Sequence, residues 1–390
     1  MTETRSLRRV MFPVLSALAV VFLVTGASLA TLPLYVHAQL GYSASVVGAI
    51  AGAQFASALI SRLWAGRHSD CHGPKAAMVV GLVMAMLAGL AYLTSVALQA
   101  RPDLALAALF VGRALLGGGE SFIITSGQAW GLALAGQNRA AMVIGWAGTA
   151  LYVALAAGGP MGGWLFSVAG FAGVAAATAL IPLLALAIIL PRPKIIPARH
   201  TNADRGSVLK AVLAPGLAMS FAGFGYSSMA FFSVLLFLQR GWQPSWLPFS
   251  AFAVALVLTR LGFAGLPDRL GGKRTTITFL GVQIIGLTGV MLAPSAGLCA
   301  LASFVAGLGY AFIYPALGRE AVVAVSPARA GVAVAFYSAF LDLSLGLSSP
   351  LLGQIADIAG VPAVFAASVL ASAVGLAIVI AMTRTHRRSA

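Results

Sequence analysis

Three ionisable side chains lie inside long apolar segments of this chain. Arg113 and Glu120 share one segment, and Asp342 lies in another, within YSAFLDLSLGLSSP. Seven residues are about two helical turns, so Arg113 and Glu120 are expected on one helix face roughly 10 Å apart. A charge at the centre of a lipid bilayer costs about 3 kcal/mol or more, so such residues usually mark a pathway. A carboxyl group away from water keeps its proton more readily, which favours Glu120 as a proton carrier, with Asp342 as its rival and Arg113 as a partner.

Each of these residues also has a structural interpretation. Arg113 and Glu120 could neutralise each other, or partners on neighbouring helices, and so hold helices together. Asp342 could be a buried carboxyl group bonded to serine or tyrosine hydroxyls. Other polar side chains could orient a substrate in an apolar cavity, or equally form bonds between helices; these are Gln54, Tyr152, Tyr226, Tyr310, Tyr314 and Tyr337.

A short charged turn occurs twice. SRLWAGRHSDCHGPK ends at Lys75 and TRLGFAGLPDRLGGK ends at Lys273. At an offset of 198 residues, four residues of the first turn (Arg62, Asp70, Gly73, Lys75) align with four of the second (Arg260, Asp268, Gly271, Lys273). An offset near half the chain length predicts two copies of one unit.

The aspartate of the first turn is a candidate gate. Asp70 could cap the N-terminus of the eleventh apolar segment or pair with an arginine, and an anion at an exposed helix N-terminus gains about 0.3 to 1 kcal/mol. The alternative is a solvated turn that only fixes topology. Gly66 belongs to the same turn and has Ala264 at the equivalent place. Gly73 and Gly271 are expected to adopt positive φ.

The composition predicts an integral membrane protein. Hydrophobic residues make up 60% of the chain and charged residues only 8%, too little polar surface for a soluble domain of this length. The net charge of +15 does not indicate nucleic acid, because no basic patch is interleaved with aromatic residues. Cys71 and Cys299 are expected on opposite membrane faces and cannot pair. No pattern predicts a metal or another cofactor.

Twelve segments are long and apolar enough to span a bilayer as helices. Their expected limits are 10–36, 44–65, 74–96, 104–129, 141–166, 170–190, 210–238, 246–266, 274–293, 297–318, 328–355 and 361–382. The polar, proline-containing interval 191–207 predicts a cytoplasmic linker between two six-helix bundles, 1–190 and 208–390.

Basic residues indicate the orientation. With the N-terminus in the cytoplasm, 21 lysines and arginines lie on the cytoplasmic side, only Arg101 and Arg240 lie outside, and Arg113 lies within a span. This bias predicts two cytoplasmic termini.

A second set of matches, at an offset of 190 residues, supports the internal repeat. Gly117 and Gly119 align with Gly307 and Gly309. Pro160 and Gly163 align with Pro350 and Gly353. Glycines in membrane helices usually allow close helix approach.

These motifs together resemble the major facilitator superfamily of secondary transporters over nearly the whole chain. The turn from Gly66 to Lys75 is similar to its signature between spans two and three. Arg113-x-x-x-Gly117-x-Gly119 is similar to the span-four motif of proton-coupled members, and Gly159-Pro160-x-x-Gly163 to the span-five motif of drug/proton antiporters. Within the superfamily, the chain resembles a bacterial branch of arabinose or drug efflux proteins. Cys71 departs from the arginine common in that turn, and Leu116 from the glutamine common in span four.

The resemblance implies an all-α fold of 6+6 helices in the inner membrane that opens alternately to each side. The expected function is proton-coupled export of a small amphipathic or partly apolar molecule by a monomer surrounded by lipid. Uptake of a sugar or organic acid is the alternative. A membrane enzyme or sensor is disfavoured, because HExxH, GxSxG and P-loop motifs are absent and no soluble domain is present.

Overall fold

The computed structural model describes residues 2–135, 140–194, 205–263, 266–326 and 329–388, and in these ranges it is built from helices without strands. The first half contains α1 (Thr2–Pro33), continued by the π-helical turn η1 (Leu34–Gln39), then α2 (Ala44–His72), α3 (Pro74–Ala97), α4 (Pro102–Ala135) and α5 (Ala140–Ile189). The all-helical prediction is therefore confirmed.

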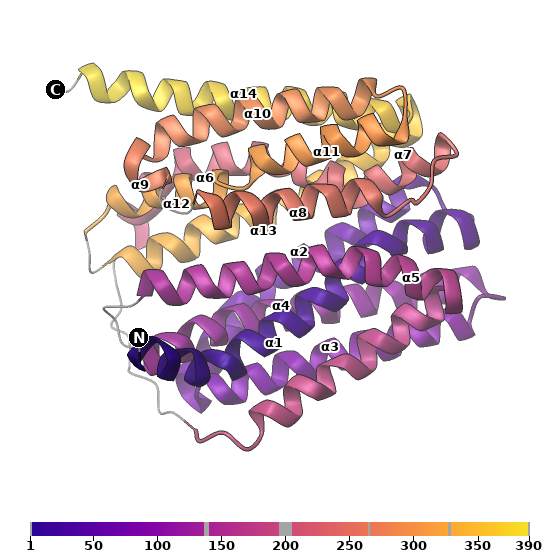
Figure 1. Cartoon of the computed structure of the whole chain (residues 1–390), viewed down its shortest axis with the longest axis horizontal. Helices are drawn as coiled ribbons and strands as arrows, with labels where there is room; N and C mark the ends of the chain where they lie inside the picture. Colours follow the sequence, from indigo (N-terminus) through magenta and orange to yellow (C-terminus); the bar gives the residue numbers. More distant parts are fainter. Residues whose placement is uncertain (1, 136–139, 195–204, 264–265, 327–328, 389–390) are drawn as a thin grey trace. The chain divides into compact units, whose positions relative to one another are not determined.

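The second half contains a larger number of shorter helices (Figure 1). They are α6 (Arg205–Ser227), the π-helical turn η3 (Ser228–Phe232), α7 (Ser233–Gln239), α8 (Leu247–Gly262), α9 (Leu266–Leu270), α10 (Gly272–Leu292), α11 (Ala296–Tyr310), α12 (Ile313–Val323), α13 (Ala330–Ala359) and α14 (Val361–Arg388).

Twelve membrane spans are consistent with these helices. In the described ranges, ten helical stretches are long and apolar enough to cross a bilayer, and α8 is a shorter apolar helix. One of the ten, α5, combines the predicted fifth and sixth spans, which meet at Gly170, where φ is 60° and ψ is −160°. Large apolar side chains such as Leu184 and Leu370 are more than half exposed, as expected for surfaces that face lipid.

The chain divides into two compact units. The first is built from the chain up to Gly41 and from Ala53 through α5. The second is built from Tyr42–Gly52 and from α6 through α14. The first turns of α2 therefore belong to the second unit and the rest of α2 to the first.

The predicted repeat is visible in how helices pack within each unit. A Cβ atom on Gly117 of α4 would lie 1.9 Å from the backbone oxygen of Gln54 in α2. A Cβ atom on Gly307 of α11 would lie 2.3 Å from the backbone oxygen of Phe252 in α8. Gln54 and Phe252 are separated by the same 198 residues as the two charged turns. Equivalent glycines thus bring equivalent pairs of helices into backbone contact.

The two charged turns end in the same backbone conformation. Gly73 precedes α3 with φ 90° and ψ 154°, and Gly271 precedes α10 with φ 79° and ψ 154°. These are φ values that side chains larger than hydrogen rarely adopt, so the expectation of positive φ at both glycines is confirmed.

Candidate functional site

A buried polar cluster surrounds Glu120 in the first unit. The Glu120 side chain on α4 is only 5% exposed. The Thr25 hydroxyl of α1 donates a hydrogen bond to its Oε1 atom at 2.5 Å, and the Gln54 amide of α2 donates one to its Oε2 atom at 2.8 Å. Side chains from two other helices, α1 and α2, therefore converge on the Glu120 carboxyl group of α4.

Close packing of α4 against α2 makes this convergence possible. Gly117 lies one helical turn before Glu120 and touches the backbone of Gln54. Because no side chain separates the two helices there, the short Gln54 side chain can reach the Glu120 carboxyl group. On the far side of α4, Gly119 packs against Gly81 of α3, where a Cβ atom would lie 2.7 Å from the backbone oxygen.

Arg113 lies two turns earlier on α4 and is completely buried. Its Nη1 atom donates a hydrogen bond to the Ser28 hydroxyl of α1 at 3.0 Å. Its Nε and Nη2 atoms have no hydrogen-bond partner within the ranges that the structure describes. Tyr92 of α3 is buried beside the guanidinium group. Arg113 and Glu120 thus hold different partners on α1, Ser28 and Thr25.

The two partners of Glu120 can serve either protonation state of a carboxyl group. A threonine hydroxyl can donate to a carboxylate or accept from a carboxylic acid. A glutamine side chain carries both a donor and an acceptor, and the Gln54 Oε1 atom has no partner among the described residues. The arrangement is therefore chemically able to hold Glu120 with or without a proton.

The second intramembrane carboxyl group, Asp342, lies on α13 in the second unit and is 7% exposed. Serines attach this helix to α6: Ser220 donates to the backbone oxygen of Phe340 at 3.1 Å, and the hydroxyls of Ser227 and Ser348 lie 2.7 Å apart. Asp342 and Glu120 are thus placed in different units.

The position equivalent to the Glu120 cluster is aromatic in the second unit. The 190-residue offset aligns Glu120 with Tyr310, and the 198-residue offset aligns Gln54 with Phe252. The rings of Tyr310 and Phe252 lie 6.1 Å apart, and Tyr226 contacts both, at 5.4 Å and 5.9 Å. The two copies of the repeat therefore carry different chemistry at the same place.

The other predicted tyrosines are divided between the units. The Tyr314 and Ser338 hydroxyls lie 2.7 Å apart, and the Tyr337 hydroxyl donates to the backbone oxygen of Tyr314 at 2.9 Å. These two tyrosines thus bond α12 to α13. Tyr152 is half-buried on α5 in the first unit.

The charged turns contain side chains of unequal exposure. Asp70 is exposed in the last turns of α2, where Arg62 and Gly66 are half-buried. In the second turn, the Arg260 Nε atom donates to the backbone oxygen of Ala311 at 3.3 Å. Asp268 lies in α9, but its side chain falls outside the described residues.

A carboxylate that the sequence analysis did not single out caps a helix. Asp357, near the end of α13, accepts hydrogen bonds from the backbone nitrogens of Ala44 at 2.9 Å and Ser45 at 3.1 Å, within the second unit. Pro350 of α13 lies against Gly48 and Gly52 of the same α2 segment. The contact is of the kind expected of Asp70, a carboxylate at the N-terminus of a helix.

The contact between α1 and α5 uses glycines next to the predicted ones. A Cβ atom on Gly158 or Gly162 would lie within 2.5 Å of a backbone oxygen of α1. The sequence analysis named their neighbours, Gly159 and Gly163, together with Pro160, which lies inside α5. Thr25, Ser28 and Tyr92 were also not singled out, because a hydroxyl group in an apolar segment carries no pattern that shows its partner.

The described ranges contain no group of three or more histidine, cysteine, aspartate or glutamate side chains placed to hold a metal ion. Cys71 is exposed, Cys299 is buried, and both are free thiols.

Relatives of the chain are found over almost its full length. An uncharacterized MFS-type transporter of Salmonella typhimurium is 35% identical over 376 residues, covering 96% of this chain and 97% of the relative. Another, from Pseudomonas aeruginosa, is 37% identical over 370 residues, covering 94% of this chain and 91% of the relative.

Solved transporters share the fold. The xylose transporter XylE from E. coli superposes with a TM-score of 0.75 at 11% identity, covering 95% of this chain and 97% of that one. The nucleoside transporter NupG superposes with a TM-score of 0.72 at 15% identity, covering 96% of this chain and 99% of that one. The family model of the Major Facilitator Superfamily matches residues 14–348. The chain therefore belongs to the Major Facilitator Superfamily and is a membrane transporter, not an enzyme.

Proposed function

We propose that this transporter exports a small amphipathic or partly apolar molecule across the bacterial inner membrane in exchange for protons, with Glu120 as the proton carrier. The observation that carries the proposal is the pair of hydrogen bonds from Thr25 and Gln54 to the buried Glu120 carboxyl group. A site that only joins helices needs one fixed set of donors and acceptors. The partners of Glu120 can each exchange donor for acceptor, as a site that gains and loses a proton requires.

Arg113 lies on the same helix as Glu120. Its buried guanidinium group bonds to Ser28 of α1, the helix that also supplies Thr25 to Glu120. Ionisable side chains buried within a membrane protein commonly mark a transport pathway, which supports the placing of the coupling site in this unit.

The aromatic side chains of the second unit support the proposed substrate class. Tyr226, Phe252 and Tyr310 form an aromatic cluster with two phenol hydroxyls at the place equivalent to the Glu120 cluster; Phe252 and Tyr310 are buried and Tyr226 is half-buried. An aromatic environment suits an apolar or amphipathic molecule, whereas a sugar needs several amide and carboxylate partners. Sugar or organic acid uptake is therefore the second candidate.

The proposal includes an orientation and an oligomeric state. Because the basic residues are so unevenly distributed, we expect both termini in the cytoplasm, a cytoplasmic linker at 191–207 joining bundles 1–190 and 208–390, and a functional monomer. Cys71 is exposed and Cys299 is buried, so a membrane-impermeant maleimide should label the natural chain at Cys71 alone. Labelling of Cys71 from outside intact cells would contradict this orientation.

The test of the function is transport by purified protein in proteoliposomes with an imposed pH gradient. Three probes separate the candidates: ethidium as an amphipathic cation, benzoate as an organic acid and arabinose as a sugar. We expect ethidium to move against its gradient in the direction opposite to protons. Movement of arabinose or benzoate together with protons, without ethidium transport, would establish the uptake alternative instead.

A further inference from the structure

Lys75 of the first charged turn bonds to the end of another helix. Its Nζ atom donates hydrogen bonds to the backbone oxygens of Leu190 at 2.7 Å and Arg192 at 2.5 Å. These residues directly follow α5, the last helix of the first unit. The final carbonyl groups of a helix have no donor within the helix, so the Lys75 ammonium group supplies hydrogen bonds that the helix itself cannot.

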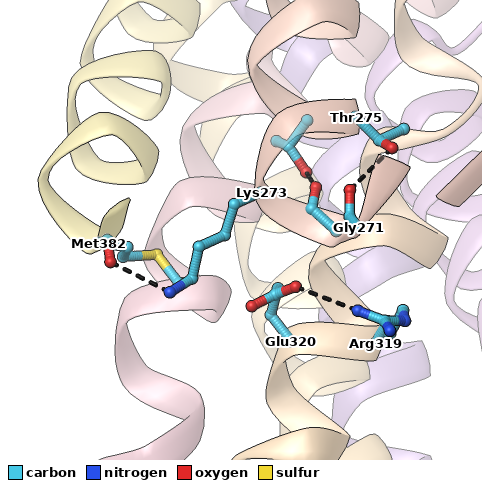
Figure 2. Close-up of polar contacts among 8 residues, drawn as sticks. Gly271, Lys273, Thr275, Arg319, Glu320 and Met382 are labelled. Carbon is cyan, nitrogen blue, oxygen red and sulfur yellow. Dashed lines mark hydrogen bonds and ion pairs between the residues drawn. The ribbon is translucent and has the colours of Figure 1, made fainter. Parts of the chain in front are cut away.

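Lys273 makes the equivalent contact in the second unit. Its Nζ atom donates to the backbone oxygen of Met382 at 3.1 Å, near the end of the apolar part of α14 and six residues before the helix itself ends at Arg388. Figure 2 shows the side chain extended toward this carbonyl. Met382 lies 190 residues after Arg192 and 192 after Leu190. The residues that accept the hydrogen bonds are therefore separated by about half the chain length, as the two lysines are. A contact that recurs in two copies with different surrounding sequence is not an accident of one loop.

Electrostatics explains the direction in which both lysines extend. Lys75 and Lys273 are each the second residue of a helix, α3 and α10, where a positive charge is disfavoured by the helix dipole. For Lys75, the C-terminal end of α5 favours the same charge. Lys273 instead reaches a carbonyl group inside α14, near the last turns of that helix. Each lysine thus extends away from the N-terminus of its own helix toward the last helix of its unit.

A carboxylate from α12 lies beside the second copy of the turn. A Cβ atom on Gly272 would lie 2.4 Å from both the backbone oxygen of Ala316 and the Oε1 atom of Glu320 on α12. In Figure 2 the Glu320 side chain lies between Lys273 and Arg319, whose Nη1 atom is 3.6 Å from Oε1. The first copy has Pro74 in place of Gly272 and Trp130 at the place equivalent to Glu320. The contact from the lysine to a backbone oxygen of the last helix is common to both copies, whereas the contact with Glu320 belongs to the second copy.

We propose that Lys75 and Lys273 are positioning residues that clamp the charged turn of each unit to the last helix of that unit, so that turn and helix move as one body. In the first unit, the clamped residues Leu190 and Arg192 lie within four residues of Lys194, where this described range ends. This inference needs neither proton coupling nor a known substrate.

The test is hydrogen exchange of the full-length protein in lipid nanodiscs, followed by mass spectrometry. Lys75→Met keeps the length of the side chain and removes its charge and donors. We expect amides 186–192 to exchange at least about fivefold faster, because two hydrogen bonds are lost and one alone is worth about 1 kcal/mol, while amides 378–383 stay unchanged. Lys273→Met should make amides 378–383 exchange faster and leave amides 186–192 unchanged, so each variant is the control for the other. Lys75→Arg keeps a charged donor and should restore slow exchange.

A spin label on Cys71 gives a readout at the turn itself. Cys71 is exposed and Cys299 is buried, so a nitroxide reagent attaches to the first turn of the natural chain. Lys75→Met should increase the mobility of the label, and Lys273→Met should not change it. If Lys75→Met does not fold, Lys75→Gln provides the same comparison with a side chain too short to reach both carbonyls. Unchanged exchange and label mobility, or equal loosening of both units by either variant, would overturn the proposal.

Discussion

Gly117 and Gln54 meet backbone to backbone, with room for a hydrogen atom but not for a methyl group between them. This contact brings α4 so close to α2 that the Gln54 amide lies 2.8 Å from the Glu120 carboxyl oxygen. A packing residue and a candidate proton site are therefore parts of one arrangement. The same packing recurs between Gly307 and Phe252, where no carboxyl group follows.

Gly117→Ala should separate α4 from α2. Its Cβ atom would overlap the Gln54 backbone oxygen, and forced overpacking typically costs about 1 to 3 kcal/mol. We expect a lower unfolding temperature in detergent and loss of transport. Gly281→Ala is the matched control, because a Cβ atom at that helical position meets nothing within 4 Å. Equal unfolding temperatures for the two variants would show that the contact is not tight.

Thr25→Val should change the pH dependence of transport. Valine has the shape of threonine without its hydroxyl, so Glu120 loses a hydrogen-bond partner that can serve either protonation state. The midpoint of the pH profile of gradient-driven transport should therefore change. Thr25→Ser, which keeps the hydroxyl, should retain the original midpoint. An unshifted profile of Thr25→Val would argue against a role for this bond.

Asp70→Asn should impair transport more than folding. Asp70 is exposed at the end of α2, so its loss removes no buried contact, whereas a gating contact needs the charge. Size-exclusion profiles should match the natural protein while ethidium transport falls severalfold. Asp268→Asn should show a milder defect, since the second turn has Ala264 in place of Gly66. Normal transport by fully expressed Asp70→Asn would leave Asp70 with a topological role alone.

The helices were predictable because bilayer spans need long apolar segments, and each expected span is occupied by one or more helices. The boundary between the fifth and sixth spans was predicted between residues 166 and 170, and the backbone leaves the helical conformation at Gly170. A break inside a span was less predictable. Residues 311–312 separate α11 from α12 within the expected span 297–318, because such a break depends on local backbone conformation and packing rather than on hydropathy.

The chemistry of the site was predictable from burial, but its partners were not. A carboxyl group in an apolar segment stands out in any sequence, and Glu120 is indeed buried. Thr25 does not stand out, since threonine is common in membrane helices and its partner depends on how α1 is rotated against α4. Gln54 was expected either to orient a substrate or to form a bond between helices. It bonds to Glu120, because the register of α2 on α4 is set by backbone contact at Gly117.

The partners of Lys75 and Lys273 could not be predicted from the sequence either. The repeat singled out Lys75 and Lys273 as part of the charged turns, but their partners are backbone oxygens, which any residue provides. No residue type at the end of α5 or α14 marks those oxygens as acceptors.

Gradient-driven transport by Glu120→Gln is the most direct test of the proposed coupling, with Asp342→Asn measured beside it. Glutamine keeps the shape of glutamate and cannot titrate, so Glu120→Gln should fail to concentrate ethidium under a pH gradient and should still exchange ethidium across the membrane at equal pH. Asp342→Asn should retain concentration against the gradient. Concentration of ethidium by Glu120→Gln, together with its loss in Asp342→Asn, would contradict the assignment and place the proton site in the second unit.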